Sequence, residues 1–440
     1  MMNSVQMREI IVGLLAATYN TVGEDGLASA FILGHRDRHP ASGGISVTLF
    51  FRRKKLMPAV MKLRSLGPPH LRYLPLGHSF EKLRSFLIDR YHLVAGKNIF
   101  SRAETSLLER ISKEQVDLLV DQFAKSDILI PSQETCLFPL VTIQMRDAFE
   151  GAVFSLSTAS GLSAQRPLVN LPRGYVNGQL FPPFTDWKYK TQAPTSWLLV
   201  TAPSPEVAKK YRASILGAIS LTVMHSYRHQ FTGRKVFGGM VSVRDGWSLS
   251  DSSPHTPAQS EDVVLGVEDG AWLDMIDRAL ASRSEADIKK LKSLQYFYRA
   301  WFLPDSERFP IDCITIDSMF GDANGATEAV ARGVEELFGG KLDRARVLLL
   351  MRLRNSVIHG GAPDVYDSSK YAKYYRDYGD DPISDMSALV AECLRRKVFD
   401  GQFREQPDPY AEVIAQAVAA GRFPAREPAG ILAPLATAAT

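Results

Sequence analysis

The stretch Leu348-Leu-Leu-Met-Arg-Leu-Arg-Asn-Ser-Val-Ile-His-Gly-Gly361 decides how the second half of this chain is interpreted. It predicts the end of a helix over residues 341–358, because glycines such as Gly360 and Gly361 adopt the left-handed backbone that follows many helices. Arg354 interrupts the apolar face of this helix. At 3.6 residues per turn its neighbours on that face are all apolar, namely Val347, Leu350, Met351, Val357 and Ile358. A guanidinium in such a place needs a partner.

Two polar residues accompany Arg354. Asn355 follows it directly, and His359 lies five residues further on, where the helix ends. Histidine is the side chain whose unperturbed pKa lies near neutral pH, so it can take up or release a proton under physiological conditions. Structural alternatives stay open: Arg354 buried and paired with Glu335 or Asp312, and His359 stabilised only by the helix dipole.

Length and composition describe an ordinary globular protein. A chain of 440 residues predicts two or three domains, and 45% hydrophobic with 23% charged residues is enough to bury a core. The net charge of +4 is compatible with a nucleic-acid partner but argues for one only weakly. Cys136, Cys313 and Cys393 are isolated, which disfavours a zinc site or a disulfide framework and fits a reducing cytosol.

The N-terminal apolar run, Ile10–Ala17, is interpreted as a buried helix and not as a signal peptide, since Arg8-Glu9 precedes it instead of a basic cluster. No apolar run reaches the roughly 18 residues that a membrane span needs. We therefore predict a soluble, cytoplasmic protein with no membrane partner.

The predicted fold class is α+β, with a mixed N-terminal domain and an all-α C-terminal domain. Residues 1–200 form the mixed domain, where residues 45–51 predict a strand and where residues 7–19, 79–91 and 103–123 predict helices. Residues 160–195, rich in glycine, proline and aromatic residues, predict an irregular connector. It is either a packed loop or an aromatic platform for nucleic-acid bases.

Residues 205–405 are predicted to form an up-and-down helical bundle, because helices of regular spacing follow one another through short connections. The polar stretch 248–262 is interpreted as a mobile loop, and the Ala/Pro-rich tail, 421–440, as disordered. Asp312 and Asp317 interrupt an apolar helix and are interpreted as polar partners within the bundle, Arg354 being one candidate partner.

The helix end resembles the HEPN family (higher eukaryotes and prokaryotes nucleotide-binding), and within it the Apea-like HEPN group. The resemblance rests on Arg354-Asn355-x-x-x-His359-Gly360 in a helical context, and it extends over roughly residues 205–400. Similar spacings at Arg64…His70 and Arg72…His78 contain proline where the family has a helix. The resemblance therefore depends more on the helical context of Arg354 and His359 than on the number of residues between them.

The resemblance implies an endoribonuclease of prokaryotic antiphage or abortive-infection systems that uses no metal and no cofactor. Two protomers would combine their motifs in one composite site, and the RNA 2′-OH would attack the adjacent phosphate. His359 would act as general acid or base, Arg354 would hold the phosphate, and Asn355 would donate to it or orient the histidine. The alternative is a HEPN module that dimerises and binds RNA, nucleotide or a partner without cleaving.

Basic residues elsewhere are candidates for positioning RNA through its phosphates, the alternative being a solvated surface. They are Arg344, Arg346 and Arg352 on the motif helix, and Arg52, Arg53, Lys54 and Lys55 in the N-terminal half. His225 and His229 have the i, i+4 spacing of metal ligands, but no third ligand is indicated nearby, so no metal site is expected. Phosphate-binding loops, dinucleotide-binding glycines and a nucleophile elbow are absent from the sequence.

Overall fold

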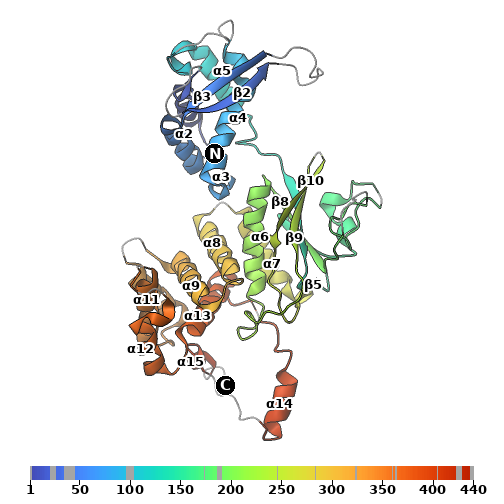
Figure 1. Ribbon diagram of the computed structural model, residues 1–440, viewed down its shortest axis with the longest axis vertical. Helices are drawn as coiled ribbons and strands as arrows, with labels where there is room; N and C mark the ends of the chain where they lie inside the picture. Colours follow the sequence, from blue (N-terminus) through green and yellow to red (C-terminus); the bar gives the residue numbers. More distant parts are fainter. Residues whose placement is uncertain are drawn as a thin grey trace. The chain divides into compact units, whose positions relative to one another are not determined.

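A computed structural model of the chain describes residues 2–19, 26–33, 45–95, 104–172, 174–185, 191–244, 246–282, 284–322, 325–358, 360–361, 364–403, 405–422 and 429–436. The chain divides into two compact units, residues 1–133 and 134–440 (Figure 1). The division lies well before residue 200, where the sequence had placed it. The reason is that the strands after residue 134 pair with strands beyond residue 196 and belong to the second unit.

The first unit packs helices against a small antiparallel sheet. Its strands are β1 (Thr18–Tyr19), β2 (Gly26–Leu33) and β3 (Ile45–Arg52), in the order β1-β3-β2. Its helices are α1 (Ser4–Ala16), α2 (Arg53–Leu66), α3 (His70–Tyr73), α4 (Leu76–Ala95) and α5 (Lys113–Ala124). The prediction of a buried N-terminal helix is confirmed, since Ile10, Ile11, Leu14 and Leu15 are fully buried.

One helix expected in this unit is shorter than predicted. A short 3-10 turn occupies Leu107–Arg110, and α5 starts only after Ser112. The Ser112 hydroxyl accepts from the Gln115 backbone, and the Gln115 side chain accepts from the Ser112 backbone, which together cap a new helix. This local capping box outweighs the apolar periodicity that predicted one continuous helix over 103–123.

The second unit is built on an antiparallel sheet. In the described part of the chain its six strands follow the order β10-β9-β4-β8-β7-β6. They are β4 (Glu134–Leu140), β6 (Phe149–Glu150), β7 (Phe154–Thr158), β8 (Ser196–Ala202), β9 (Gly238–Val243) and β10 (Trp247–Pro254). A separate parallel pair joins β5 (Ile143–Met145) to β11 (Val263–Leu265).

The strands β9, β10 and β11 correct two expectations. Residues 205–405 are not all helical, and the stretch 248–262 is not a loop throughout, because β10 pairs with β9 from Trp247 to Pro254. A strand at the edge of a sheet takes its hydrogen bonds from the neighbouring strand and can carry a polar sequence. The serines of β10 were therefore misinterpreted as a linker. Helices account for 55% of the structure and strands for 14%, which makes the whole a mixed fold with a helical C-terminal region.

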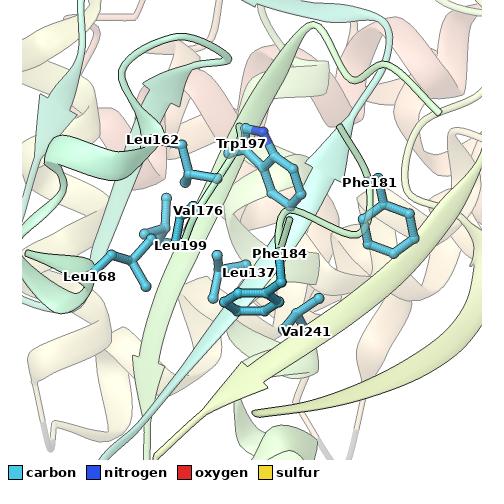
Figure 2. Packing of buried hydrophobic residues seen from close by; sticks show 9 residues of the cluster. All are labelled: Leu137, Leu162, Leu168, Val176, Phe181, Phe184, Trp197, Leu199 and Val241. Carbon is cyan, nitrogen blue, oxygen red and sulfur yellow. The ribbon is translucent and has the colours of Figure 1, made fainter. Parts of the chain in front are cut away.

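The two faces of the large sheet are covered differently. The helix α6 (Pro205–Ser220) lies on one face (Figure 1). On this face the Arg212 guanidinium lies 5.2 Å from the centre of the Phe138 ring. The irregular connector covers the other face. Figure 2 shows its side chains packed on strand residues in one cluster, which contains Leu137, Leu162, Leu168, Val176, Phe181, Phe184, Trp197, Leu199 and Val241. Because Phe181 and Phe184 are buried, the packed-loop interpretation is confirmed for them.

The helices after residue 270 form the region that carries the motif. They are α7 (Gly270–Ala281), α8 (Glu285–Ala300), α9 (Asp305–Phe320), α10 (Ala326–Phe338), α11 (Arg344–Ile358), α12 (Ser369–Tyr378), α13 (Pro382–Phe399), α14 (Ala411–Ala419) and α15 (Ala433–Ala436). The helices α8, α10, α11 and α13 all contact α9. None of the helices among the described residues is both long and apolar enough to cross a membrane.

Part of the C-terminal tail is ordered, contrary to expectation. Ile431 is 2% exposed, and its backbone N–H donates to the Asp385 carboxylate over 2.9 Å. Asp385 also binds Arg346 and Tyr374. A composition rich in alanine and proline therefore did not prevent residues 429–436 from docking. The remaining tail positions, 423–428 and 437–440, lie outside the described residues.

Candidate functional site

The helix α11 ends where the sequence predicted. It spans Arg344–Ile358, and Gly360 follows with a φ of 73°, its N–H donating to the Val357 carbonyl. A positive φ of this size favours glycine, which explains the glycine at this position. His359 itself lies outside the described residues, so only its place in the sequence, between Ile358 and Gly360, enters the argument.

Arg354 has a partner within its own chain. Its Nη2 forms an ion pair with Asp317 on α9, and its Nη1 donates to Oδ1 of the Asn355 side chain over 2.8 Å. The side chains of Arg354 and Asp317 are 16% and 18% exposed. Asp317 was one of the two carboxylates assigned as polar partners in the bundle. Glu335, by contrast, pairs with Arg344, and Asp312 lies in a separate cluster described below.

The ion pair leaves polar atoms unused. Neither Arg354 Nε nor Asp317 Oδ1 has a hydrogen-bond partner among the described residues, although both atoms are buried. Burial raises the pKa of Asp317, and the Arg354 charge opposes that rise. Asn355 is tied to the start of α10, since its Nδ2 donates to Thr327 Oγ1 over 3.4 Å. The arrangement therefore presents one guanidinium, one amide and one carboxylate at the last turns of α11.

The apolar flank of Arg354 is mostly covered by its own chain. Val347, Leu350 and Met351 are at most 2% exposed. Only the last turn remains open, with Val357 half-buried and Ile358 41% exposed. The surface available for a second protomer beside Arg354 is thus confined to the end of the helix.

The basic residues of α11 that were predicted to contact RNA differ in their exposure and in their ion pairs within the chain. Arg352 is exposed. Arg344 is bound by Glu328 and Glu335, with distances of 2.8 and 2.6 Å. Arg346 is largely buried between the carboxylates of Asp380 and Asp385, which pair with its Nη2, and the Tyr374 hydroxyl, which accepts from its Nε. Its role as an RNA contact is not supported, because those carboxylates neutralise it.

The N-terminal basic residues lie at the junction of β3 and α2. Arg53, Lys54 and Lys55 are exposed, whereas the Arg52 guanidinium stacks 4.1 Å from the Tyr19 ring. Lys55 Nζ donates to the Tyr19 hydroxyl over 2.8 Å. These residues belong to the first unit and Arg354 to the second, and each unit is described by itself.

The histidine pair is not on a helix. The helix α6 ends at Ser220, so His225 and His229 lie in the turns that follow it. Their i, i+4 spacing therefore does not place them on one face of a helix. Among the described residues, no group of three or more His, Cys, Asp or Glu side chains could hold a metal ion. Sequence reasoning missed what surrounds the pair: buried Arg228, Arg308 and Asp312. The sequence signals were Arg228 between the two histidines, interpreted as part of a basic surface although it is fully buried, and the charges of Arg308 and Asp312, one turn apart in an apolar helix.

Three histidines of the second unit are held neutral. Burial, assisted by neighbouring arginines, lowers the pKa of His225 to about 3 and that of His229 to about 2. Burial and Arg212 lower the pKa of His255 to about 3. His255 Nδ1 lies 2.7 Å from Arg212 Nη1 and accepts from it, while Nε2 donates to the Gly239 carbonyl over 2.6 Å.

These lowered pKa values predict loss of stability in acid. Between pH 6.5 and 3 the unfolded chain binds a proton at each histidine and the folded chain does not, so unfolding is favoured as the pH falls. Lowering the pH from 7.5 to 5.5 should reduce the free energy of unfolding by about 1.4 kcal/mol for each histidine. Urea titrations at the two pH values, followed by tryptophan fluorescence, measure the change. All five tryptophans lie beyond residue 133, so the signal reports the second unit.

A matched pair of variants assigns the effect. Burial raises the pKa of Asp312 to about 7, so this carboxyl gains a proton in the folded chain over the same range and partly offsets the loss. His229→Gln should therefore reduce the histidine contribution to the pH dependence by about 1.4 kcal/mol. His78→Gln, at an exposed position of the first unit, should leave the fluorescence transition unchanged. A pH dependence in His229→Gln equal to that of the parent protein would contradict the assignment of a neutral His229.

Comparisons with known proteins identify no relative of this chain. No protein-family model, no curated protein and no solved structure matches the chain.

Proposed function

We propose that this chain is a metal-independent endoribonuclease of the HEPN type, in which Arg354, Asn355 and His359 act on RNA in a site that a second copy of the chain completes. The observation that carries the proposal is the placement of the Arg354 guanidinium in the last turns of α11. It is partly open to solvent, and its Nε is unpartnered among the described residues. His359 lies five residues further along the sequence.

The charges suit binding of a phosphate. Arg354 is held by Asp317 through Nη2 and by the Asn355 side chain through Nη1, while its Nε has no hydrogen-bond partner among the described residues. An RNA phosphate can therefore compete for the same guanidinium through a bidentate contact. The negative charge that builds up on the phosphate during cleavage would strengthen that contact further.

The chemical steps need only a base and an acid. His359, or its copy in a second protomer, removes the proton of the 2′-OH, whose oxygen then bonds to the adjacent phosphorus. The bond from phosphorus to the 5′ oxygen breaks, and that oxygen takes up a proton. The products are a 2′,3′-cyclic phosphate and a 5′-OH, with no redox change and no water consumed. The biological role that accompanies this proposal is RNA cleavage in antiphage defence or abortive infection.

The end of α11 also supports the dimer part of the proposal. Ile358 is exposed beside Arg354, and Val357 is only half-buried. An apolar turn next to a polar site is a suitable contact for a second copy. The patch is small, so a stable dimer would need additional surface from elsewhere.

One observation favours a different function. The Arg354–Asp317 ion pair is complete within one protomer, as expected of a structural arginine. In that case the helical region binds RNA, nucleotide or a partner protein and does not cleave. Binding of RNA without any cleaved product would support this second candidate.

The test is cleavage of end-labelled RNA by the purified full chain in excess EDTA, with identification of the product ends. We expect cleavage that EDTA does not change, products that end in a 2′,3′-cyclic phosphate, and loss of both with His359→Ala. The matched control is His78→Ala, because Arg72…His78 has a similar spacing outside the motif helix. Cleavage abolished by EDTA, or unaffected by His359→Ala, would contradict the proposal.

A further inference from the structure

A cavity of about 470 Å³ lies between three helices of the second unit. The first turns of α8 line one side of it, and the last residues of α9 and α13 line the rest. The helix α9 packs against both of the others. We call this space the three-helix cavity. Its volume falls in the range of about 300–1,000 Å³ that is typical of binding sites for small molecules.

The surface inside the three-helix cavity is mainly apolar. Ala286, Met319 and Val398 supply most of it, together with the methylene stems of lysines. None of the described residues that line the cavity has an amide, hydroxyl or aromatic side chain. A nucleobase or a sugar would therefore lose hydrogen bonds to water here without gaining replacements, which is costly. An aliphatic chain has no such bonds to lose, so the lining favours an aliphatic ligand.

Charged side chains accompany the apolar surface. Lys289 and Lys290 on α8 and Lys397 on α13 contribute three ammonium groups, whereas Glu285 contributes one carboxylate. The lining therefore has a net charge of +2. Helices far apart in the sequence bring these like charges to the same cavity, where they repel one another. An anion bound among them would relieve that repulsion.

The ammonium groups are available to a ligand. Lys289 and Lys397 are exposed and form no ion pair within the described residues, and Lys397 Nζ lies 4.5 Å from the centre of the Phe320 ring. Lys290 Nζ lies 3.9 Å from Asp287 Oδ1, and both side chains are partly exposed. An exposed ion pair of this length contributes little, so it competes only weakly with a bound anion.

We propose that the three-helix cavity binds an amphipathic small-molecule anion, namely an aliphatic chain that ends in a carboxylate or a phosphate group. The chain lies against Ala286, Met319 and Val398, and the anionic group lies among the three ammonium groups. The flexible thioether side chain of Met319 adapts to the shape of the chain. None of the lining residues belongs to the motif at the end of α11, so the site stands or falls separately from the proposed RNA cleavage.

Calorimetric titration of the full chain at pH 7 tests the proposal. The ligands are decanoate, decyl phosphate and decyltrimethylammonium, which share one alkyl chain, each kept below the concentration at which it forms micelles. We expect the anions to saturate a single site and to bind about tenfold or more tightly than the cation, because the net charge of the lining attracts one and repels the other. The tighter of the two anions identifies the head group. Equal binding of anions and cation, or no binding of either anion, would overturn the proposal.

A double variant tests the role of the charges. Lys289→Gln combined with Lys397→Gln should weaken binding of decanoate about tenfold, the equivalent of one lost charge-assisted hydrogen bond. The matched control combines Lys341→Gln with Lys370→Gln, at exposed positions of the same unit outside the cavity. Both double variants lower the net charge of the chain equally, so a general attraction between protein and anion would weaken by the same amount in each. Equal effects in the two would contradict a defined site.

A second variant tests the role of the space. Ala286→Phe places a ring where the alkyl chain would lie and leaves every charge in place, so it should abolish measurable binding of decanoate. Ala286 is exposed, and the control is Ala281→Phe at an exposed position of α7 outside the cavity, which should bind as the parent does. Unchanged binding by folded Ala286→Phe would show that decanoate does not occupy the three-helix cavity.

Discussion

Replacing Arg354 with alanine is expected to lower the rate of RNA cleavage about a thousandfold, the usual effect of removing a positive group that stabilises charge on a transferring phosphate. In the last turns of α11 the guanidinium donates to Asn355 Oδ1 over 2.8 Å. Cleavage rates of the purified variant and the parent, at equal concentrations of folded protein, measure the loss. Arg352→Ala, two residues earlier at an exposed position, serves as the matched control and should retain activity within about tenfold if it only positions RNA.

The ion pair with Asp317 makes a second variant necessary. Arg354→Ala leaves this carboxylate half-buried without its partner, so a loss of activity could reflect a loss of folding. Asp317→Asn removes the competing charge and keeps the side-chain volume. If Arg354 binds the RNA phosphate, Asp317→Asn should cleave as fast as the parent or faster. If both variants lose activity only in proportion to the folded protein they lose, the pair is structural and the proposed role of Arg354 is wrong.

Replacing Gly217 with valine is expected to destabilise the second unit by about 4 kcal/mol or more, at the upper end of what overpacking and strain produce. Gly217 lies in α6 where this helix crosses α8. A Cβ atom at this position would lie 2.1 Å from the Leu294 carbonyl oxygen and 2.9 Å from its carbon. Both atoms belong to the backbone of α8, so the clash can be relieved only by separating the helices. Urea denaturation followed by tryptophan fluorescence measures the effect.

Gly217→Ala decides between two opposing effects. Helix propensity alone predicts that alanine stabilises a helix interior by about 1 kcal/mol relative to glycine. The contact with Leu294 predicts the opposite sign, because the added methyl group already overlaps the backbone of α8. We expect the contact to dominate and alanine to destabilise by about 2 kcal/mol. Gly270→Ala, at the start of α7 where nothing lies within 4 Å of an added Cβ, should be close to neutral. A stabilising Gly217→Ala would show that the two helices separate easily.

Local signals explain which elements could be predicted from the sequence. The end of α11 followed from Gly360, and the buried face of α1 followed from the spacing of Ile10, Ile11, Leu14 and Leu15. Caps and periodicity act within a few residues, so they are readable without the rest of the fold. The same kind of signal failed for β10, whose polar sequence carries no apolar alternation. Its structure depends on pairing with β9.

The candidate site, too, could be predicted from the sequence only in part. The sequence by itself determined that Arg354 lies on a helix, that Asn355 and His359 accompany it, and that its apolar neighbours demand a partner. Only the tertiary structure decided that the partner is Asp317, that Arg346 is enclosed by Asp380 and Asp385, and that Arg308 pairs with Asp305 and not with Asp312. The physical reason is that a charge selects its partner by distance and burial, and both are set by how helices far apart in the chain pack against one another.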